Sequence, residues 1–100
     1  TSAVREITTG EIPVDFKLGQ NFPNPFNPTT TIAFALPKSS SVELIIYDTK
    51  GAVVAELIKQ HFAAGKYEVK WNVTDLASGV YLYRLHAGEF VAAKTMLFIK

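Results

Sequence analysis

Hydrophobic and polar positions alternate over short stretches from residue 31 onward, as in β-strands that bury one face. The clearest stretches are 31–36, 41–48, 66–73 and 80–87, where apolar side chains occupy every second position. Residues that favour turns, mainly Gly, Pro, Asp and Ser, separate these stretches. The pattern predicts an all-β protein in which the strands follow one another at intervals of about ten residues.

The same alternation predicts which side chains fill the core. The apolar face of each clear stretch consists of Ile32, Phe34 and Leu36; Val42, Leu44 and Ile46; Tyr67, Val69 and Trp71; and Tyr81, Tyr83 and Leu85. Trp71 is the only tryptophan and is expected to be a core anchor. Together with two further stretches these strands predict an immunoglobulin-like antiparallel β-sandwich of about seven strands.

The two further stretches are harder to interpret. In 52–62 the apolar residues also match one face of a helix, but turn residues on both sides, Gly51 before it and Gly65 after it, favour a strand. In 90–100 both faces are apolar. One set of alternate residues is assigned to the core, namely Val91, Ala93, Thr95, Leu97 and Ile99, which leaves Phe90, Met96 and Phe98 facing outward.

The first thirty residues lack a regular period. Residues 1–15 are interpreted as a linker or lead-in from an upstream domain, although Ile7, Ile12 and Val14 could pair at a sheet edge. Residues 16–30 contain three prolines, each after an asparagine or phenylalanine, and are expected to be extended or turning without helix. Four apolar side chains in this segment are expected to enter the core: Phe16, Leu18, Phe22 and Phe26.

Composition narrows the function. The chain has 100 residues, enough for one domain, with 48% hydrophobic residues, a net charge of +1 and no cysteine. The absence of a basic stripe argues against nucleic-acid binding, and no apolar stretch has the length of a membrane span. The start of the chain does not have the pattern of a signal peptide, so the chain is expected to be a piece of a longer one. No cofactor, metal or crosslink is expected.

Candidate chemistry is sparse, and the chain is not expected to be an enzyme. His61 and His86 fall on different predicted strands and are expected to be surface histidines. Asp48 begins an expected type I turn that ends at Gly51, a position where a positive φ favours glycine. Tyr81 follows Gly79 at the start of a strand, as in a tyrosine corner, or it is an ordinary core tyrosine.

Several segments, taken in order, resemble a known family. They are FKLGQNFPNPFNPTTTIAFALP, VELIIYDTKGAVVAEL, AGKYEVKW, DLASGVYLYRLHAGEF and KTMLFIK, which span about residues 16–100. They are similar to the type A C-terminal sorting domain of cargo proteins of the type IX (Por) secretion system. The Asn-Phe-Pro-Asn-Pro-Phe-Asn-Pro stretch is the most specific part, whereas Ala52 stands where family members often carry a basic residue.

The resemblance implies a non-catalytic sorting domain, residues 16–100, at the end of a larger secreted protein. It implies passage through the periplasm to the cell surface or the medium. The implied partners are the type IX translocon, outer-membrane sortase or shuttle proteins, and an upstream cargo domain. The sorting-motif residues that would be recognised are Asn24, Pro25, Phe26, Gly51, Gly79, Tyr81, Lys94, Met96 and Lys100.

By the same resemblance, the last strand, from Lys94 to Lys100, is expected to lie closest to the translocon. An outward apolar strip of Phe90, Met96 and Phe98 would suit docking or strand addition there, unless the strand is central to its sheet. Two other functions remain open. Exposed aromatics, with Tyr47, Phe90 and Phe98 as candidates, would indicate a carbohydrate-binding module, and a flat polar surface would indicate a passive spacer.

Overall fold

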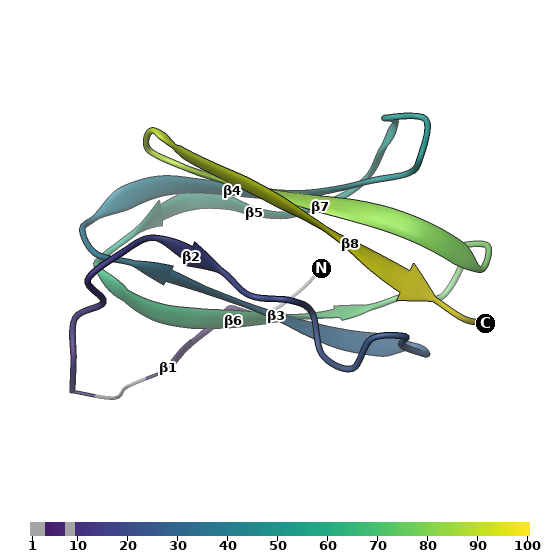
Figure 1. Ribbon diagram of the computed structural model, residues 1–100, viewed down its shortest axis with the longest axis horizontal. Helices are drawn as coiled ribbons and strands as arrows, with labels where there is room; N and C mark the ends of the chain where they lie inside the picture. The colour runs from purple at the N-terminus through teal and green to yellow at the C-terminus, as the bar shows by residue number, and fades with distance from the viewer. Residues whose placement is uncertain (1–3, 8–9) are drawn as a thin grey trace.

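A computed structural model describes residues 4–7 and 10–100, and this part of the chain contains eight strands and no helix. The strands form two four-stranded antiparallel sheets that face each other (Figure 1). In spatial order, sheet A contains β1 (Val4–Ile7), β6 (Gly65–Asn72), β3 (Thr29–Leu36) and β2 (Lys17–Leu18). Sheet B contains β5 (Val53–Phe62), β4 (Ser40–Tyr47), β7 (Gly79–Ala87) and β8 (Phe90–Phe98). The predicted immunoglobulin-like sandwich is confirmed.

The core lies between the two sheets and consists of the side chains that the alternation predicted. All twelve core positions predicted on β3, β4, β6 and β7 are buried, among them Trp71. Directly paired residues of antiparallel strands point to the same side of their sheet, so the register keeps these sets together. In sheet B, for example, Leu44 pairs with Leu85 and Ile46 with Tyr83.

The ambiguous stretch 52–62 is a strand, as predicted. Its pairing with β4 is interrupted by register shifts between Leu44 and Ile45 and between Ile46 and Tyr47. Each shift inserts an extra residue into β5 and reverses the side of the sheet to which the following side chains point. These irregularities explain why the sequence of β5 lacks a clean alternation and imitates a helix.

The face assigned to the last strand is wrong. Met96 and Phe98 are buried, whereas Val91, Leu97 and Ile99 are exposed. The pairing with β7 requires this arrangement, because Met96 lies opposite the buried Tyr81. The predicted outward strip of Phe90, Met96 and Phe98 therefore does not exist, and a different set of side chains faces the solvent.

The N-terminal part of the chain completes sheet A. Ile7 pairs with Lys66 at the edge of the sheet, whereas Ile12 and Val14 are exposed in the connection to β2. Leu18 and Phe26 enter the core as predicted, and Phe16 packs partly buried against Phe90. The prediction for Phe22 is wrong, because 79% of this residue is exposed. Phe22 pairs with Thr31, which belongs to the solvent-facing set of β3, so its ring points away from the core.

The expected turn between β4 and β5 is present. The amide of Gly51 donates to the carbonyl oxygen of Asp48, and Gly51 has a φ of 85°. The carboxylate of Asp48 accepts bonds from the amides of Lys50 and Ala52, at 2.9 and 3.0 Å. Asp48 therefore holds its own turn together, which is the usual role of aspartate at this position.

Candidate functional site

The proline- and asparagine-rich segment 20–28 connects the edges of the two sheets. On one side the backbone of Phe22 exchanges two hydrogen bonds with Thr31 of β3, both at 2.9 Å. On the other side Phe26 donates to the carbonyl oxygen of Leu97 and accepts from the amide of Ile99. The segment thus runs beside the last half of β8 and closes the sandwich on this side (Figure 1).

Side chains add to this connection. The side-chain oxygen of Asn24 accepts the amide of Leu97 at 2.9 Å, and the side-chain amide of Gln20 donates to the carbonyl oxygen of Thr95 at 2.8 Å. These bonds occupy backbone groups that an edge strand otherwise leaves open to another chain. Strand addition along the second half of β8 would therefore have to displace Asn24 and Phe26.

A buried polar network fixes the start of the segment. The amide of Asn21 donates to the hydroxyl oxygen of Tyr83, and that hydroxyl donates to the carbonyl oxygen of Gly19. The side-chain amide of Asn21 donates to Thr30, whose hydroxyl donates to the carbonyl oxygen of Pro23. Among the described residues no buried side-chain nitrogen or oxygen lacks a partner. The network links the segment to β3 and β7 at a buried position, where an unmet hydrogen bond is costly.

Burial raises the pKa of Tyr83 to about 12, and the bond from the Asn21 amide opposes this rise. The folded protein therefore holds the phenol proton more tightly than the unfolded chain, whose tyrosine pKa is about 10. The corresponding stability is fully present below pH 10 and is lost as the pH rises through about 12.

We expect Tyr83→Phe to lower the free energy of unfolding by about 1–3 kcal/mol at neutral pH, because Gly19 and Asn21 lose their partner. We also expect the variant to lose less stability than the wild type when the pH is raised above 10. Urea unfolding of both proteins across this range measures the difference. Parallel alkaline losses in the two proteins would contradict the role given to Tyr83.

Aromatic rings hold the other end of the segment. The ring of Phe26 lies 6.0 Å from that of Trp71 and 5.2 Å from that of Phe98, between centroids. These two partners come from β8 and from the end of β6, so the ring of Phe26 joins both sheets. Met96, another predicted site residue, is buried in the same core.

Two tyrosines are fixed in the same way at the starts of their strands. Tyr81 donates its hydroxyl to the carbonyl oxygen of Ala77 at 2.6 Å, which confirms the predicted tyrosine corner. Tyr67 makes the equivalent bond to Ala63 at 2.8 Å. Both sites have the pattern Ala-x-Gly-x-Tyr, in which three residues with glycine in the middle separate the alanine from the tyrosine. Sequence reasoning missed this repeat. Gly79 has a φ of 153°, a backbone conformation that residues with a side chain rarely adopt, so a substitution there would be strained.

The remaining predicted site residues are accessible at the surface. Pro25, Gly51 and Lys100 are exposed, and Gly79 and Lys94 are partly so. The structure brings several of the nine together where segment 20–28 meets the end of β8 and the start of β7. Asn24 and Phe26 both bond Leu97, Met96 lies opposite Tyr81, and Gly79 lies opposite Phe98. Phe26, Tyr81 and Met96 are buried there, whereas Asn24 is exposed, and Gly51 lies apart in the turn between β4 and β5. Their part in recognition stays a prediction.

The described residues offer little chemistry. No group of three or more His, Asp or Glu side chains in this part of the chain could hold a metal ion. His86 lies 3.6 Å from Glu43 on the neighbouring strand, a pair that sequence reasoning missed because it depends on the register of β4 and β7. Within the described ranges there is also no helix long and apolar enough to cross a membrane.

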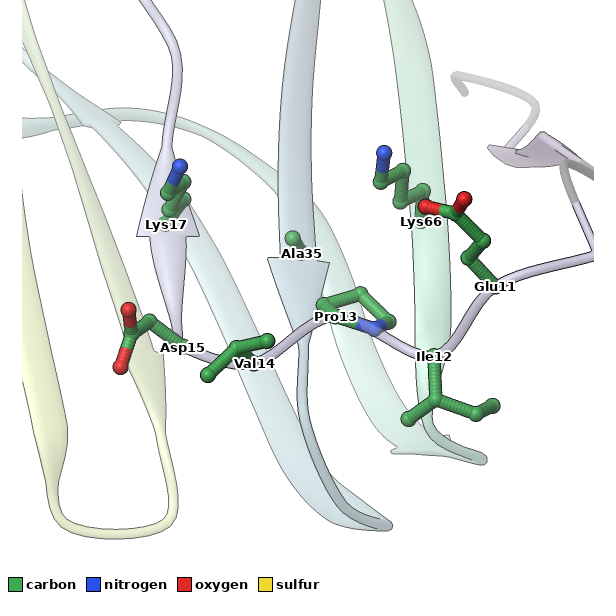
Figure 2. Close-up of a pocket in the computed structure, with 8 residues that line it drawn as sticks. All are labelled: Glu11, Ile12, Pro13, Val14, Asp15, Lys17, Ala35 and Lys66. Carbon is green, nitrogen blue, oxygen red and sulfur yellow. The ribbon is translucent and has the colours of Figure 1, made fainter.

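A shallow depression of about 230 Å³ lies where residues 11–15 cross the ends of β2, β3 and β6. Figure 2 shows the side chains of Lys17 and Lys66 pointing the same way on either side of Ala35, with the Glu11 carboxylate turned toward Lys66. The mixed lining places no nucleophile beside a general base. The depression is therefore a gap beneath the loop 11–15, and its side chains are not arranged as in an active site.

The aromatic residues considered for sugar binding do not share a face. Phe98 is buried, and Phe90 stacks on Phe16 at 5.2 Å between centroids. Tyr47 lies on the outer face of sheet B under the guanidinium group of Arg84. A stacking platform for a sugar chain needs coplanar exposed rings, which these three side chains do not provide.

Comparison with known proteins identifies the family. Residues 20–100 match the family model described as secretion system C-terminal sorting domain. The chain belongs to this family of sorting domains. The matched residues begin with the segment that closes the sandwich and continue through every later strand. No curated protein and no solved structure matches the chain.

The function of the chain follows from its membership in this family. The chain is a C-terminal sorting signal for type IX secretion of a larger cargo protein. This function implies export to the cell surface or the extracellular space. Sorting domains of this family are in general non-catalytic. The sequence resemblance is confirmed. The most specific part of the motif is the segment that links β3 to the end of β8, through hydrogen bonds of Asn21, Asn24 and Phe26.

Proposed function

We propose that the domain is read as a folded object by the type IX translocon and by outer-membrane sortase or shuttle proteins, and that it catalyses nothing itself. The observation that supports this proposal is that the proline- and asparagine-rich segment 20–28 is bonded into the folded sandwich. Asn21 and Phe26 are buried, and Asn24 is bonded to β8, so a linear reading of this segment would require unfolding. The exposed part of the segment, residues 22–25, is therefore presented in the one conformation that the closed sandwich imposes on it.

We further propose that residues 16–100 are the transferable unit and that 1–15 lead in from an upstream cargo domain. The nine predicted site residues then act in two ways. Phe26, Tyr81 and Met96 maintain the shape from the core, and Asn24 maintains it at the surface through its bond to β8. The other five residues lie where the machinery can reach them: Pro25, Gly51, Gly79, Lys94 and Lys100.

The test fuses residues 16–100, or the full chain, to a fluorescent protein directed to the periplasm of a bacterium with a type IX system. We expect both fusions to reach the surface or the medium. A fusion that folds but stays in the periplasm would refute the sorting function of the chain.

Replacing both Lys94 and Lys100 by alanine tests the terminal lysines without removing part of β8. We expect reduced export from a variant that melts like the wild type. Normal export of this variant would leave the sorting function standing and would remove the two lysines from the recognised surface.

A further inference from the structure

The outer faces of the two sheets differ in chemistry. Sheet A presents charged side chains to the solvent: Arg5, Lys17, Lys66, Glu68 and Lys70. Sheet B presents aliphatic side chains over the start of β7 and the end of β8. We call this set the C-terminal apolar patch, and it consists of Val80, Leu82, Leu97 and Ile99.

The patch is contiguous. Val80 lies directly opposite Leu97 in the register of β7 and β8. Leu82 lies two residues after Val80 on β7, and Ile99 lies two residues after Leu97, just beyond the end of β8. Because the strands are antiparallel, Leu82 and Ile99 flank this pair on opposite sides. Val80, Leu97 and Ile99 are 46%, 36% and 49% exposed. Single exposed aliphatic residues are ordinary on a protein surface, whereas contiguous apolar patches are often functional.

A depression of about 340 Å³ continues the patch across the sheet. Its lining includes Tyr47, Leu82, Arg84 and the turn from Asp48 to Gly51, the last a predicted site residue. The Asp48 carboxylate in this turn accepts the amides of Lys50 and Ala52. Arg84 is exposed, and its guanidinium carbon lies 5.8 Å from the centre of the Tyr47 ring. Among the described residues no carboxylate forms an ion pair with Arg84.

Arg84 lies beside the apolar patch, and the one carboxylate that lines the same depression, that of Asp48, is bonded to its own turn. An exposed arginine without an ion pair at such a place favours a partner that supplies a carboxylate. We propose that the C-terminal apolar patch and Arg84 form the docking surface for a protein component of the secretion machinery. The contact surface of that partner is apolar and carries a carboxylate that meets Arg84. This inference rests on the proposed function, since it names the surface through which the folded signal is read.

The position of the patch supports this assignment. The patch lies on the solvent side of β7 and of the end of β8, whereas the predicted site residues Tyr81 and Met96 pack on the core side of the same strands. The buried side chains of Tyr81 and Met96 therefore fix the position of the strands whose outer face carries the C-terminal apolar patch. The second half of β8 is also closed along its edge by Asn24 and Phe26, so the accessible feature there is the face of the strand.

The test uses the full chain fused to a periplasm-directed fluorescent protein in a type IX host. The patch variant replaces Val80, Leu97 and Ile99 by threonine, which keeps strand propensity. The matched control replaces three other exposed aliphatic residues, Val14, Val53 and Val91, by threonine. A second pair compares Arg84→Glu with Lys70→Glu on the charged sheet. Thermal melting of each purified chain establishes that it folds.

We expect the patch variant and Arg84→Glu to lower the exported fraction by about tenfold or more, and both controls to export like the wild type. Equal export by patch and control variants would overturn the proposal while leaving the sorting function intact. Failure of the unmodified fusion would instead refute the sorting function.

The purified chain is also tested for self-association by sedimentation. A dimer that the patch variant abolishes, with export unchanged, would assign the patch to a second copy of the chain and overturn the proposal. Loss of export from a monomeric, folded patch variant supports it.

Discussion

Replacing Trp71 by alanine is expected to unfold the domain or to lower its free energy of unfolding by about 3–5 kcal/mol. The indole is buried at the end of β6 and packs beside Phe26, so truncation leaves a cavity at the junction of the two sheets. A domain of this size has a total stability of only about 5–15 kcal/mol. Chemical denaturation followed by circular dichroism measures the loss.

Trp71→Phe is the matched control, because it keeps an aromatic ring at this position and removes less volume. We expect it to be clearly more stable than the alanine variant. If Trp71→Ala unfolds at nearly the same denaturant concentration as the wild type, the burial of Trp71 and the face assigned to β6 are both wrong.

Phe26→Ala is expected to cost about the same, roughly 3–5 kcal/mol. The ring of Phe26 contacts Trp71 and Phe98. The amide of Phe26 donates to the carbonyl oxygen of Leu97, and its carbonyl oxygen accepts from the amide of Ile99. Loss of the ring removes the packing that keeps this backbone beside β8. Denaturant unfolding measures the change, and protection of the Ile99 amide from hydrogen exchange reports directly on the connection.

The same segment supplies a control in Phe22. This residue is also a phenylalanine next to a proline but is exposed, so Phe22→Ala should change stability by no more than about 0.5 kcal/mol. If Phe22→Ala and Phe26→Ala lowered the free energy of unfolding equally, the burial of Phe26 and the exposure of Phe22 would be contradicted.

The sequence predicted the fold well where alternation was regular. β3, β4, β6 and β7 each bury every second residue, and short turns separate them, so their faces follow from the apolar pattern alone. The pattern did not decide β8, because both sets of alternate residues are apolar. Two residues, Gly88 and Glu89, separate the paired residues Ala87 and Phe90. A two-residue turn places these two side chains on one face, so that turn could have assigned β8 correctly.

The candidate site was less predictable, because it depends on contacts between distant residues. Asn24 and Leu97 are 73 positions apart, and Asn21 and Tyr83 are 62 apart. The spacing of prolines indicates a rigid segment but gives no information on which strand it meets. The exposed patch was missed for a different reason: assigning β8 to the wrong face placed Leu97 and Ile99 in the core.

The most direct test of the sorting function compares one host with and without its type IX translocon. The full chain is fused to a periplasm-directed fluorescent protein, and intact cells are treated with an external protease. We predict that the fusion is degraded or released only in the strain with the translocon and is protected in the periplasm of the strain without it. Protection of a folded fusion in both strains, or equal access in both, would contradict the account.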